Sequence, residues 1–256
     1  MKSADNDIRS FLDESYLKYN RSSFIENDPV SIPHRFSKKE DIEIAGFLTA
    51  TIAWGNRKSI ISNALKLMAH MDEAPHDFLL HQSARELKVF ETFVHRTFNG
   101  KDCRFFITSL KNIYLSHGGL EGAFSNAGTP GLQHNIVQFR NLFLAPKHLP
   151  RTDKHVSNPL QKSSAKRLCM FLRWMVRKDN KGVDFGIWKG ISPADLCLPL
   201  DVHTGNVSRA LGLLQRRQND WQAVEEITAA LRIFDPADPV KYDFALFGLG
   251  VDKVLK

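Results

Sequence analysis

The chain has 256 residues, of which 43% are hydrophobic and 25% are charged. This is the composition of a globular protein with a substantial core, so one large domain or two smaller lobes are expected. The net charge of +7 is compatible with a polyanionic partner without identifying one. Cys103, Cys169 and Cys197 lack the spacing of a disulfide framework or a metal knuckle, and neither a signal peptide nor a membrane span is evident. We therefore expect a cytoplasmic protein without membrane attachment.

Helical spacing dominates the first hundred residues. Apolar positions between residues 8 and 16 predict an amphipathic helix. Ser37 and Glu40 have the spacing of a capping box, which predicts that Ser37 caps the next helix. That helix is apolar nearly all round, as is typical of a centrally buried helix. Further helices are predicted from Ile60 onward and across residues 87–98.

Glycine and proline mark the middle of the chain. Residues 115–135 are rich in glycine and are predicted to be largely turn or loop. Residues 146–164 carry three prolines among polar residues, which indicates a long surface connection. Helical spacing then returns in four segments: residues 166–177, 207–214, 224–234 and 244–247. No alternating strand pattern of any length occurs, so the predicted fold class is all-α.

Asp201 is the first candidate for a functional group. It follows Pro199-Leu200 and precedes a helical segment, so the simplest interpretation is a helix N-cap. A carboxylate held at a helix N-terminus is also kept ionised and fixed in place, so a cap and a catalytic group are compatible. His203 falls in the first turn of the same helix, where packing is its simplest role.

Lys166 is the second candidate. It opens a helix that is otherwise apolar, and the simplest interpretation is a lysine whose amine reaches out to solvent from a helix end. The alternative is a nucleophilic amine, with Arg167 and Lys162 as nearby cations. Residue spacing alone does not decide between the two.

The segment from Asp201 to Leu213 reads Asp-x-His-x-x-x-Val-Ser-Arg-x-Leu-Gly-Leu. It resembles the segment after the catalytic hairpin in helix-hairpin-helix DNA glycosylases of the endonuclease III and 8-oxoguanine glycosylase superfamily. Residues 160–166 lie over the hairpin of that superfamily, with Lys166 at the position of its Schiff-base lysine. The two hairpin glycines are replaced by Lys162 and Ser164. This departure and the long gap before Asp201 look more like the archaeal 8-oxoguanine glycosylase branch.

The resemblance extends from Phe47 to Gly250 in the same order, and the whole chain also resembles a bacterial family described only as a domain of unknown function. It implies a bilobal fold with a cleft between two helical lobes. The expected helical barrel lobe comprises residues 39–177. The second lobe comprises residues 1–38 and 192–256, and residues 178–191 connect the two.

The resemblance also implies the roles of individual residues. Lys166 would attack the sugar of a damaged nucleotide, while Asp201 would stabilise charge and assist deprotonation. The expected partner is damaged or abasic DNA, bound by a monomer, with no cofactor and no metal; the four-cysteine iron–sulfur loop of the superfamily is absent. The expected DNA contacts are Trp54, Asn56, Arg57, Lys58, Lys162, Ser163, Ser164, Arg167 and His203.

Two other classes of function stay open at this point. One is a nucleic-acid-binding protein that retains the fold without catalysis, since the hairpin lacks its glycines. The other is a metal-dependent phosphohydrolase using His76 and Asp77 with His34 and Asp201. Pro75 argues against the second class, because it predicts a helix start at His76, whereas ligand pairs of that kind lie in the middle of a helix.

Overall fold

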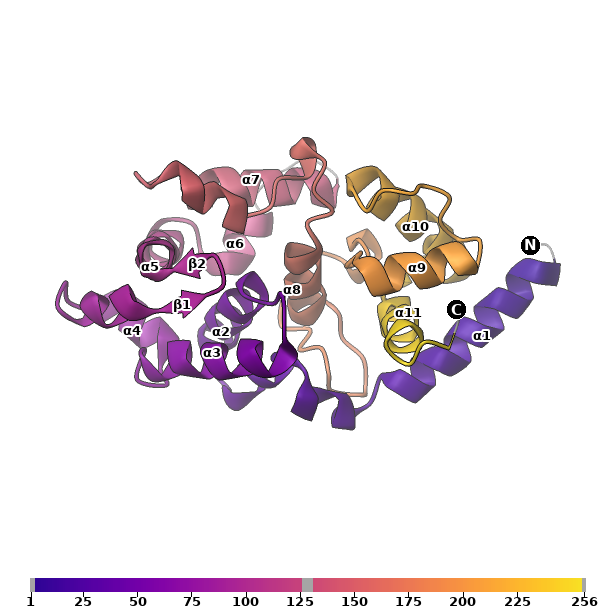
Figure 1. Ribbon diagram of the computed structural model, residues 1–256, viewed down its shortest axis with the longest axis horizontal. Coiled ribbons are helices and arrows are strands. Elements are labelled where there is room, and N and C mark those ends of the chain that lie inside the picture. Colours follow the sequence, from indigo (N-terminus) through magenta and orange to yellow (C-terminus); the bar gives the residue numbers. More distant parts are fainter. Residues whose placement is uncertain (1–2, 126–130, 255–256) are drawn as a thin grey trace. The chain divides into compact units, whose positions relative to one another are not determined.

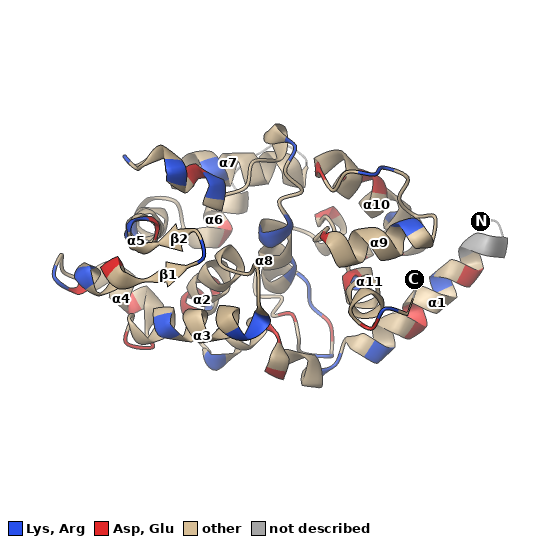
Figure 2. Cartoon of the chain, viewed as in Figure 1, with Lys and Arg blue, Asp and Glu red and all other residues tan. Residues whose placement is uncertain are grey.

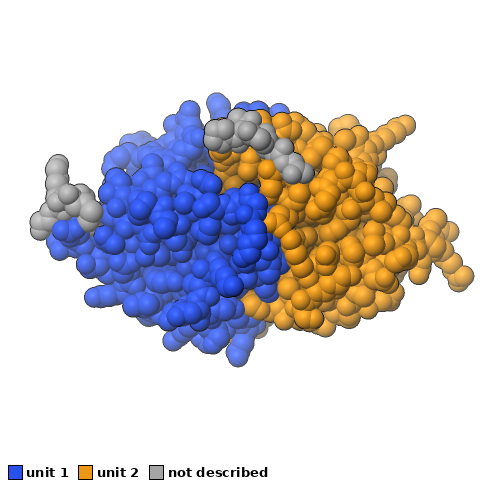
Figure 3. Space-filling view, turned by 180° about the vertical axis from the view of Figure 1, so that it is seen from behind, with its two compact units in different colours: residues 1–26, 158–256 blue, residues 27–157 orange. Residues whose placement is uncertain are grey.

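The computed structural model describes residues 3–125 and 131–254. The chain divides into two compact units, which Figure 3 colours separately. Unit 1 comprises residues 1–26 and 158–256, and unit 2 comprises residues 27–157. Both units are built mainly from helices (Figure 1), and the strands among the described residues are the antiparallel pair β1 (Val94–His95) and β2 (Phe98–Asn99). The predicted all-α class is therefore confirmed.

Unit 2 is organised around an aromatic core. Phe47 lies on the buried helix α2 (Lys39–Thr51), and its ring centroid is 6.0 Å from that of Phe106, 5.4 Å from that of Phe139 and 5.3 Å from that of Phe143. All four side chains are almost completely buried, as expected for the main source of stability in a helical unit. The helices of this unit are α2 (Lys39–Thr51), α3 (Arg57–Ala69), α4 (Pro75–His81), α5 (Gly100–Ser116), α6 (Gly119–Ser125) and α7 (Leu132–Leu144).

Unit 1 joins the N-terminal helix to the C-terminal part of the chain. Its helices are α1 (Ser3–Tyr19), α8 (Lys166–Val176), α9 (Val202–Ala210), α10 (Trp221–Phe234) and α11 (Tyr242–Val251). Helix α11 packs closely on two neighbours. A Cβ atom at Gly248 would lie 2.3 Å from the ring of Tyr19 on α1, and one at Gly250 would lie 2.9 Å from the Cβ of His203 on α9. Glycine is therefore required where these helices touch.

The grouping of α8 with unit 1 differs from the predicted lobe of residues 39–177. Ion pairs as well as apolar contacts hold α8 in unit 1. Arg173 of α8 and Arg177, the C-cap of this helix, form ion pairs with Asp184, Asp238 and Asp243, all of which follow the helix in the chain. Lys166 and Asp201 consequently belong to one unit.

Three local predictions are wrong. Helix α2 begins at Lys39 with Lys38 as N-cap and no side-chain cap, so Ser37 lies one residue too early to close a capping box. Residues 87–98 form a 3-10 helix (Glu86–Thr92) and the β1–β2 hairpin instead of an α-helix. The turn of that hairpin holds Arg96 at a φ of 54°, a conformation that no α-helix contains.

The third error concerns the glycine-rich stretch of residues 115–135. Helix α6 lies inside it, and α7 begins at Leu132; residues 126–130 of the predicted loop lie outside the described residues. Leu120, Ala123 and Phe124 are buried on one face of α6, a helical spacing that the surrounding glycines obscured. No helix in the described part of the chain has the length and apolarity that a membrane span requires.

Candidate active site

The segment before α8 is a tight hairpin without glycine. Asn158 caps a 3-10 helix, Pro159–Gln161, and Lys162 follows in the left-handed conformation with a φ of 61°. Ala165, the N-cap of α8, is also left-handed, with a φ of 47°. A side chain at such a backbone position costs about 1 kcal/mol relative to glycine. The turn at Lys162 thus adopts a backbone conformation that favours glycine.

The side chains of both hairpin serines, Ser163 and Ser164, form hydrogen bonds with the backbone. Ser163 Oγ accepts a hydrogen bond from the backbone N–H of Ala165 at 3.1 Å. Ser164 Oγ donates to the carbonyl of Leu200 at 3.3 Å, and Leu200 directly precedes Asp201. The hairpin is therefore fastened to the segment that carries the candidate carboxylate. Lys162 remains exposed on the same turn.

Lys166 is the first residue of α8, as predicted, and its amine faces Asp201. The distance from Lys166 Nζ to Asp201 Oδ2 is 3.8 Å, and the side chains are 27% and 23% exposed. The amine also lies 3.7 Å from the sulfur of Met170, one turn along the helix. The pair is thus partly withdrawn from solvent yet open enough for a ligand to reach. The ribbon is basic at this end of α8 (Figure 2).

The two oxygens of Asp201 have separate partners. Oδ1 accepts hydrogen bonds from the backbone N–H groups of His203, at 2.8 Å, and Thr204, at 3.0 Å. Thr204 Oγ1 in turn accepts a hydrogen bond from the backbone N–H of Asp201, which completes a capping box. Asp201 is therefore the N-cap of α9, as predicted. Asn219 fixes the Asp201 carbonyl at 2.9 Å. One oxygen anchors the carboxylate, and the other faces the amine.

A second carboxyl group lies within electrostatic reach of this pair. Asp243, on α11, is 5% exposed and accepts a short hydrogen bond from Arg173 of α8. Burial raises the pKa of Asp243 to about 6, and Asp201 pushes it in the same direction, while Arg173 and Lys166 oppose the shift. A proton thus binds here far more readily than at an ordinary aspartate.

Arg177 ties the other end of α8 to the rest of unit 1. Its guanidinium is 1% exposed and donates to Asp238, Asp179, Asp184 and the hydroxyl of Tyr16 at 2.8–3.1 Å. Burial disfavours the cation, but the surrounding carboxylates outweigh burial and raise its pKa. A buried charge that is satisfied on all sides fixes the position of the helix that carries it.

The other predicted site residues of unit 1 lie at or near the first turns of α8 and α9. His203 is exposed, and its ring centroid lies 6.0 Å from that of Phe247 on α11, so it packs at the edge of the site. Arg167 follows Lys166, and burial lowers the pKa of its guanidinium to about 10. Lys162, Ser163 and Ser164 complete this group through the hairpin.

Trp54, Asn56, Arg57 and Lys58 form a separate group in unit 2. Asn56 caps α3 through the N–H of Ser59 at 3.2 Å, which places Arg57 and Lys58 in the first helical turn. The Trp54 ring is half-buried, 5.1 Å from the ring of His95 and 6.0 Å from that of His155. The side chain of Arg96 lies against Gly55, which has a φ of 103°.

Sequence reasoning missed Asp243, Arg173 and Arg177. The sequence did contain a signal for these residues. Arg173 and Arg177 stand four positions apart among apolar residues, and Asp243 lies in the apolar segment 242–249. Charged side chains that are buried in this way require partners. In the described ranges, no group of three or more His, Cys, Asp or Glu side chains is arranged to hold a metal ion. His76, from the metal-dependent alternative, is the second residue of α4 and lies 2.9 Å from Lys38 Nζ.

The match to a known family covers most of the chain. Residues 28–252 match the family described as "Protein of unknown function (DUF2400)", and the chain belongs to that family. The predicted membership of a family of unknown function is thereby confirmed. No curated protein and no solved structure matches the chain.

Proposed function

We propose that this protein is a DNA N-glycosylase with an associated AP-lyase step, acting through Lys166 and Asp201. The observation that carries the proposal is the 3.8 Å approach of Lys166 Nζ to Asp201 Oδ2, with the other carboxylate oxygen fixed by the α9 N-cap. Preorganised pairing of an amine with an immobile carboxylate is what covalent base excision requires.

The chemistry uses groups in this site, the substrate and water. The neutral Lys166 amine forms a bond to C1′ as the C1′–base bond breaks, and the base leaves with the bonding electron pair. The proton lost by nitrogen passes by way of Asp201 to the departing base. The C1′–O4′ bond then opens to a protonated imine as water gives a proton to O4′. The hydroxide that remains takes a proton from C2′, and the 3′ phosphate leaves with the electron pair of the C3′–O bond.

Surrounding features support this use of the pair. Lys162 and Arg167 add positive charge to the chain next to Lys166, which favours a phosphate backbone. The Ser164–Leu200 hydrogen bond fixes the spacing between the hairpin and the carboxylate. In unit 2, Trp54 supplies an aromatic ring for further contacts with DNA, and Arg57 and Lys58 at the start of α3 supply positive charges.

The test is covalent trapping. The full chain is incubated with duplexes containing an abasic site, 8-oxoguanine, hypoxanthine or uracil in the presence of sodium borohydride, which reduces an imine to a stable cross-link. We expect the wild type to cross-link to at least one duplex. Lys166→Ala should abolish the adduct, and Asp201→Asn should slow its formation at least about 100-fold, since asparagine keeps the cap and loses the charge.

The matched control is Lys181→Ala, which removes an exposed lysine of the same unit that makes no side-chain hydrogen bond among the described residues. It should cross-link like the wild type. An adduct that persists in Lys166→Ala would refute the assigned nucleophile. Salt-sensitive DNA binding that survives Asp201→Asn, with no adduct or released base on any duplex, would instead show a binding protein without catalysis.

A further inference from the structure

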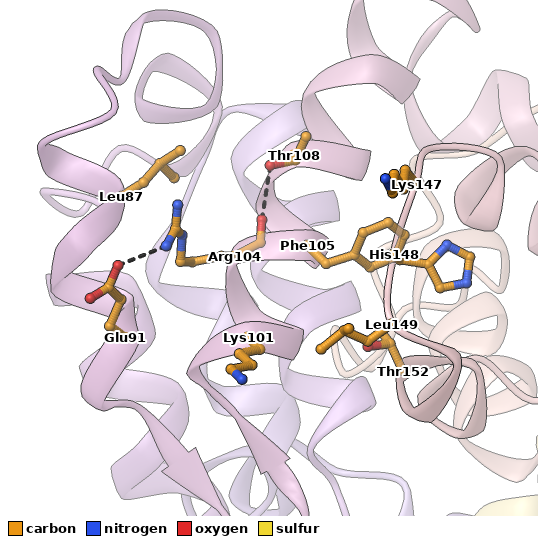
Figure 4. Close-up of a pocket in the computed structure, with 10 residues that line it drawn as sticks. All are labelled: Leu87, Glu91, Lys101, Arg104, Phe105, Thr108, Lys147, His148, Leu149 and Thr152. Atoms are coloured by element: carbon orange, nitrogen blue, oxygen red, sulfur yellow. Dashed lines mark hydrogen bonds and ion pairs between the residues drawn. The ribbon is translucent and has the colours of Figure 1, made fainter.

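Unit 2 contains a cavity that is distinct from the Lys166–Asp201 site (Figure 4). Its volume is about 520 Å³, within the range of small-molecule binding sites. The 3-10 helix of residues 86–92 and α5 form one part of its wall, and the loop after α7 forms another. The lining residues are Leu87, Glu91, Lys101, Arg104, Phe105, Thr108, Lys147, His148, Leu149 and Thr152.

The charges on this wall are mostly positive. Lys101, Arg104 and Lys147 are exposed, and Glu91 is the one acidic residue of the lining. Glu91 is already paired with Arg104, at 2.7 Å. Neither lysine forms an ion pair with any residue in the described ranges 3–125 and 131–254. Two ammonium groups therefore remain available for an anion that enters the cavity.

The floor of the cavity is aromatic and apolar. The ring centroid of Phe105 lies 4.7 Å from that of His148, with the ring planes inclined at 38°, and the two rings lie side by side in Figure 4. Phe143 packs edge-on against Phe105 at 5.9 Å and fixes the ring from behind. Leu87 and Leu149 extend the apolar surface. A planar ring can lie on such a floor with favourable stacking energy.

Two polar contacts hold the His148 ring in place. Its Nδ1 lies 2.7 Å from the carbonyl of Pro146, and its Nε2 lies 2.7 Å from Asp153. The imidazole plane is thereby immobilised beside Phe105.

We propose that this cavity binds a nucleotide, with the phosphate at Lys101 and Lys147 and the base on the Phe105 floor. A bare phosphate would leave the apolar floor unused, and an uncharged ring would leave the two ammonium groups without a partner. A phosphorylated planar ring uses both features, and the volume accommodates one such unit. The source is either a free mononucleotide or one unit of a nucleic-acid strand. The proposal does not depend on chemistry at Lys166.

The test measures affinity by calorimetry with the full chain. The probes are 2′-deoxyadenosine 5′-monophosphate, 2′-deoxyadenosine, inorganic phosphate and a five-residue oligodeoxyadenylate. We expect the monophosphate to bind at least about tenfold more tightly than the nucleoside or phosphate. Lys101→Ala/Lys147→Ala should weaken it about tenfold, since each exposed charge contributes a factor of about 2–5. Phe105→Leu should weaken it about threefold by removing the stacking ring.

The control is Lys66→Ala/Lys88→Ala, which makes the same charge change at exposed positions of unit 2 that do not line the cavity. It should leave the affinity within twofold of the wild type. Lysine-dependent binding of the oligonucleotide that is tighter than that of the monophosphate would identify a strand as the source; equal or weaker binding would identify the free nucleotide. The proposal is wrong if the monophosphate does not bind, if the Lys101/Lys147 double substitution has no effect, or if phosphate binds equally well.

Discussion

Replacement of Arg177 by methionine should strongly destabilise unit 1. The guanidinium is 1% exposed and donates to three aspartates and the hydroxyl of Tyr16. Methionine fills much of the volume but leaves buried carboxylates without their cation. Removing one partner of a buried ion pair costs about 3–5 kcal/mol. For a chain of this length, we expect the melting temperature to fall by about 10 °C.

Urea denaturation measures this loss directly, and the matched control is Arg9→Met. Arg9 pairs with Asp13 at 3.7 Å with both side chains exposed, so its removal should cost less than about 0.5 kcal/mol. The loss of unfolding free energy for Arg177→Lys should lie between those for Arg177→Met and Arg9→Met, because one ammonium group cannot replace a guanidinium that bonds four residues. A loss below about 1 kcal/mol for Arg177→Met would refute the view that this network fixes α8.

Two further outcomes concern α11. Gly248→Ala should destabilise the protein by about 1–3 kcal/mol in urea, because its Cβ would meet the Tyr19 ring at 2.3 Å; a neutral result would mean that α1 shifts freely. Asp243 should make stability fall as pH rises. Its folded pKa of about 6 exceeds the ordinary 3.8, so the folded chain binds more protons between these values. Relative to Asp243→Asn, the wild type should therefore lose about 2–3 kcal/mol of unfolding free energy from pH 4 to pH 7, and a difference that is constant with pH would contradict the shift.

The site could be predicted from sequence where local chemistry determines it. Asp201 follows a proline-leucine pair and precedes a helix, so its role as N-cap follows from its position, and Lys166 begins the helix that its spacing predicts. The contact between them depends on the fold, and only the resemblance indicated it. The apolar segment around Asp243 indicates that this aspartate needs a buried partner, but it does not identify Arg173, which is 70 positions away.

The fold errors have the same origin. Of the predicted helical face Leu87, Phe90, Val94 and Phe98, the structure buries Phe90 and Phe98 but leaves Val94 59% exposed, because a 3-10 helix and a hairpin replace the α-helix. A Cβ at Gly100 would lie 2.2 Å from the carbonyl oxygen of Glu91, so the start of α5 passes directly against this segment. Tertiary packing selected the backbone there, so the apolar spacing predicted neither the type of structure nor the full set of buried side chains.

The hairpin before α8 forms a tight turn without glycine. Lys162 takes the left-handed turn that a glycine would adopt without cost. The serine hydroxyls do not point to phosphate binding, since Ser163 holds the Ala165 N–H and Ser164 holds the Leu200 carbonyl. Under the proposed function, Lys162 is then the hairpin residue that would meet a phosphate by charge. The two serine hydrogen bonds make the hairpin a fixed connection between the start of α8, which carries Lys166, and the segment that carries Asp201.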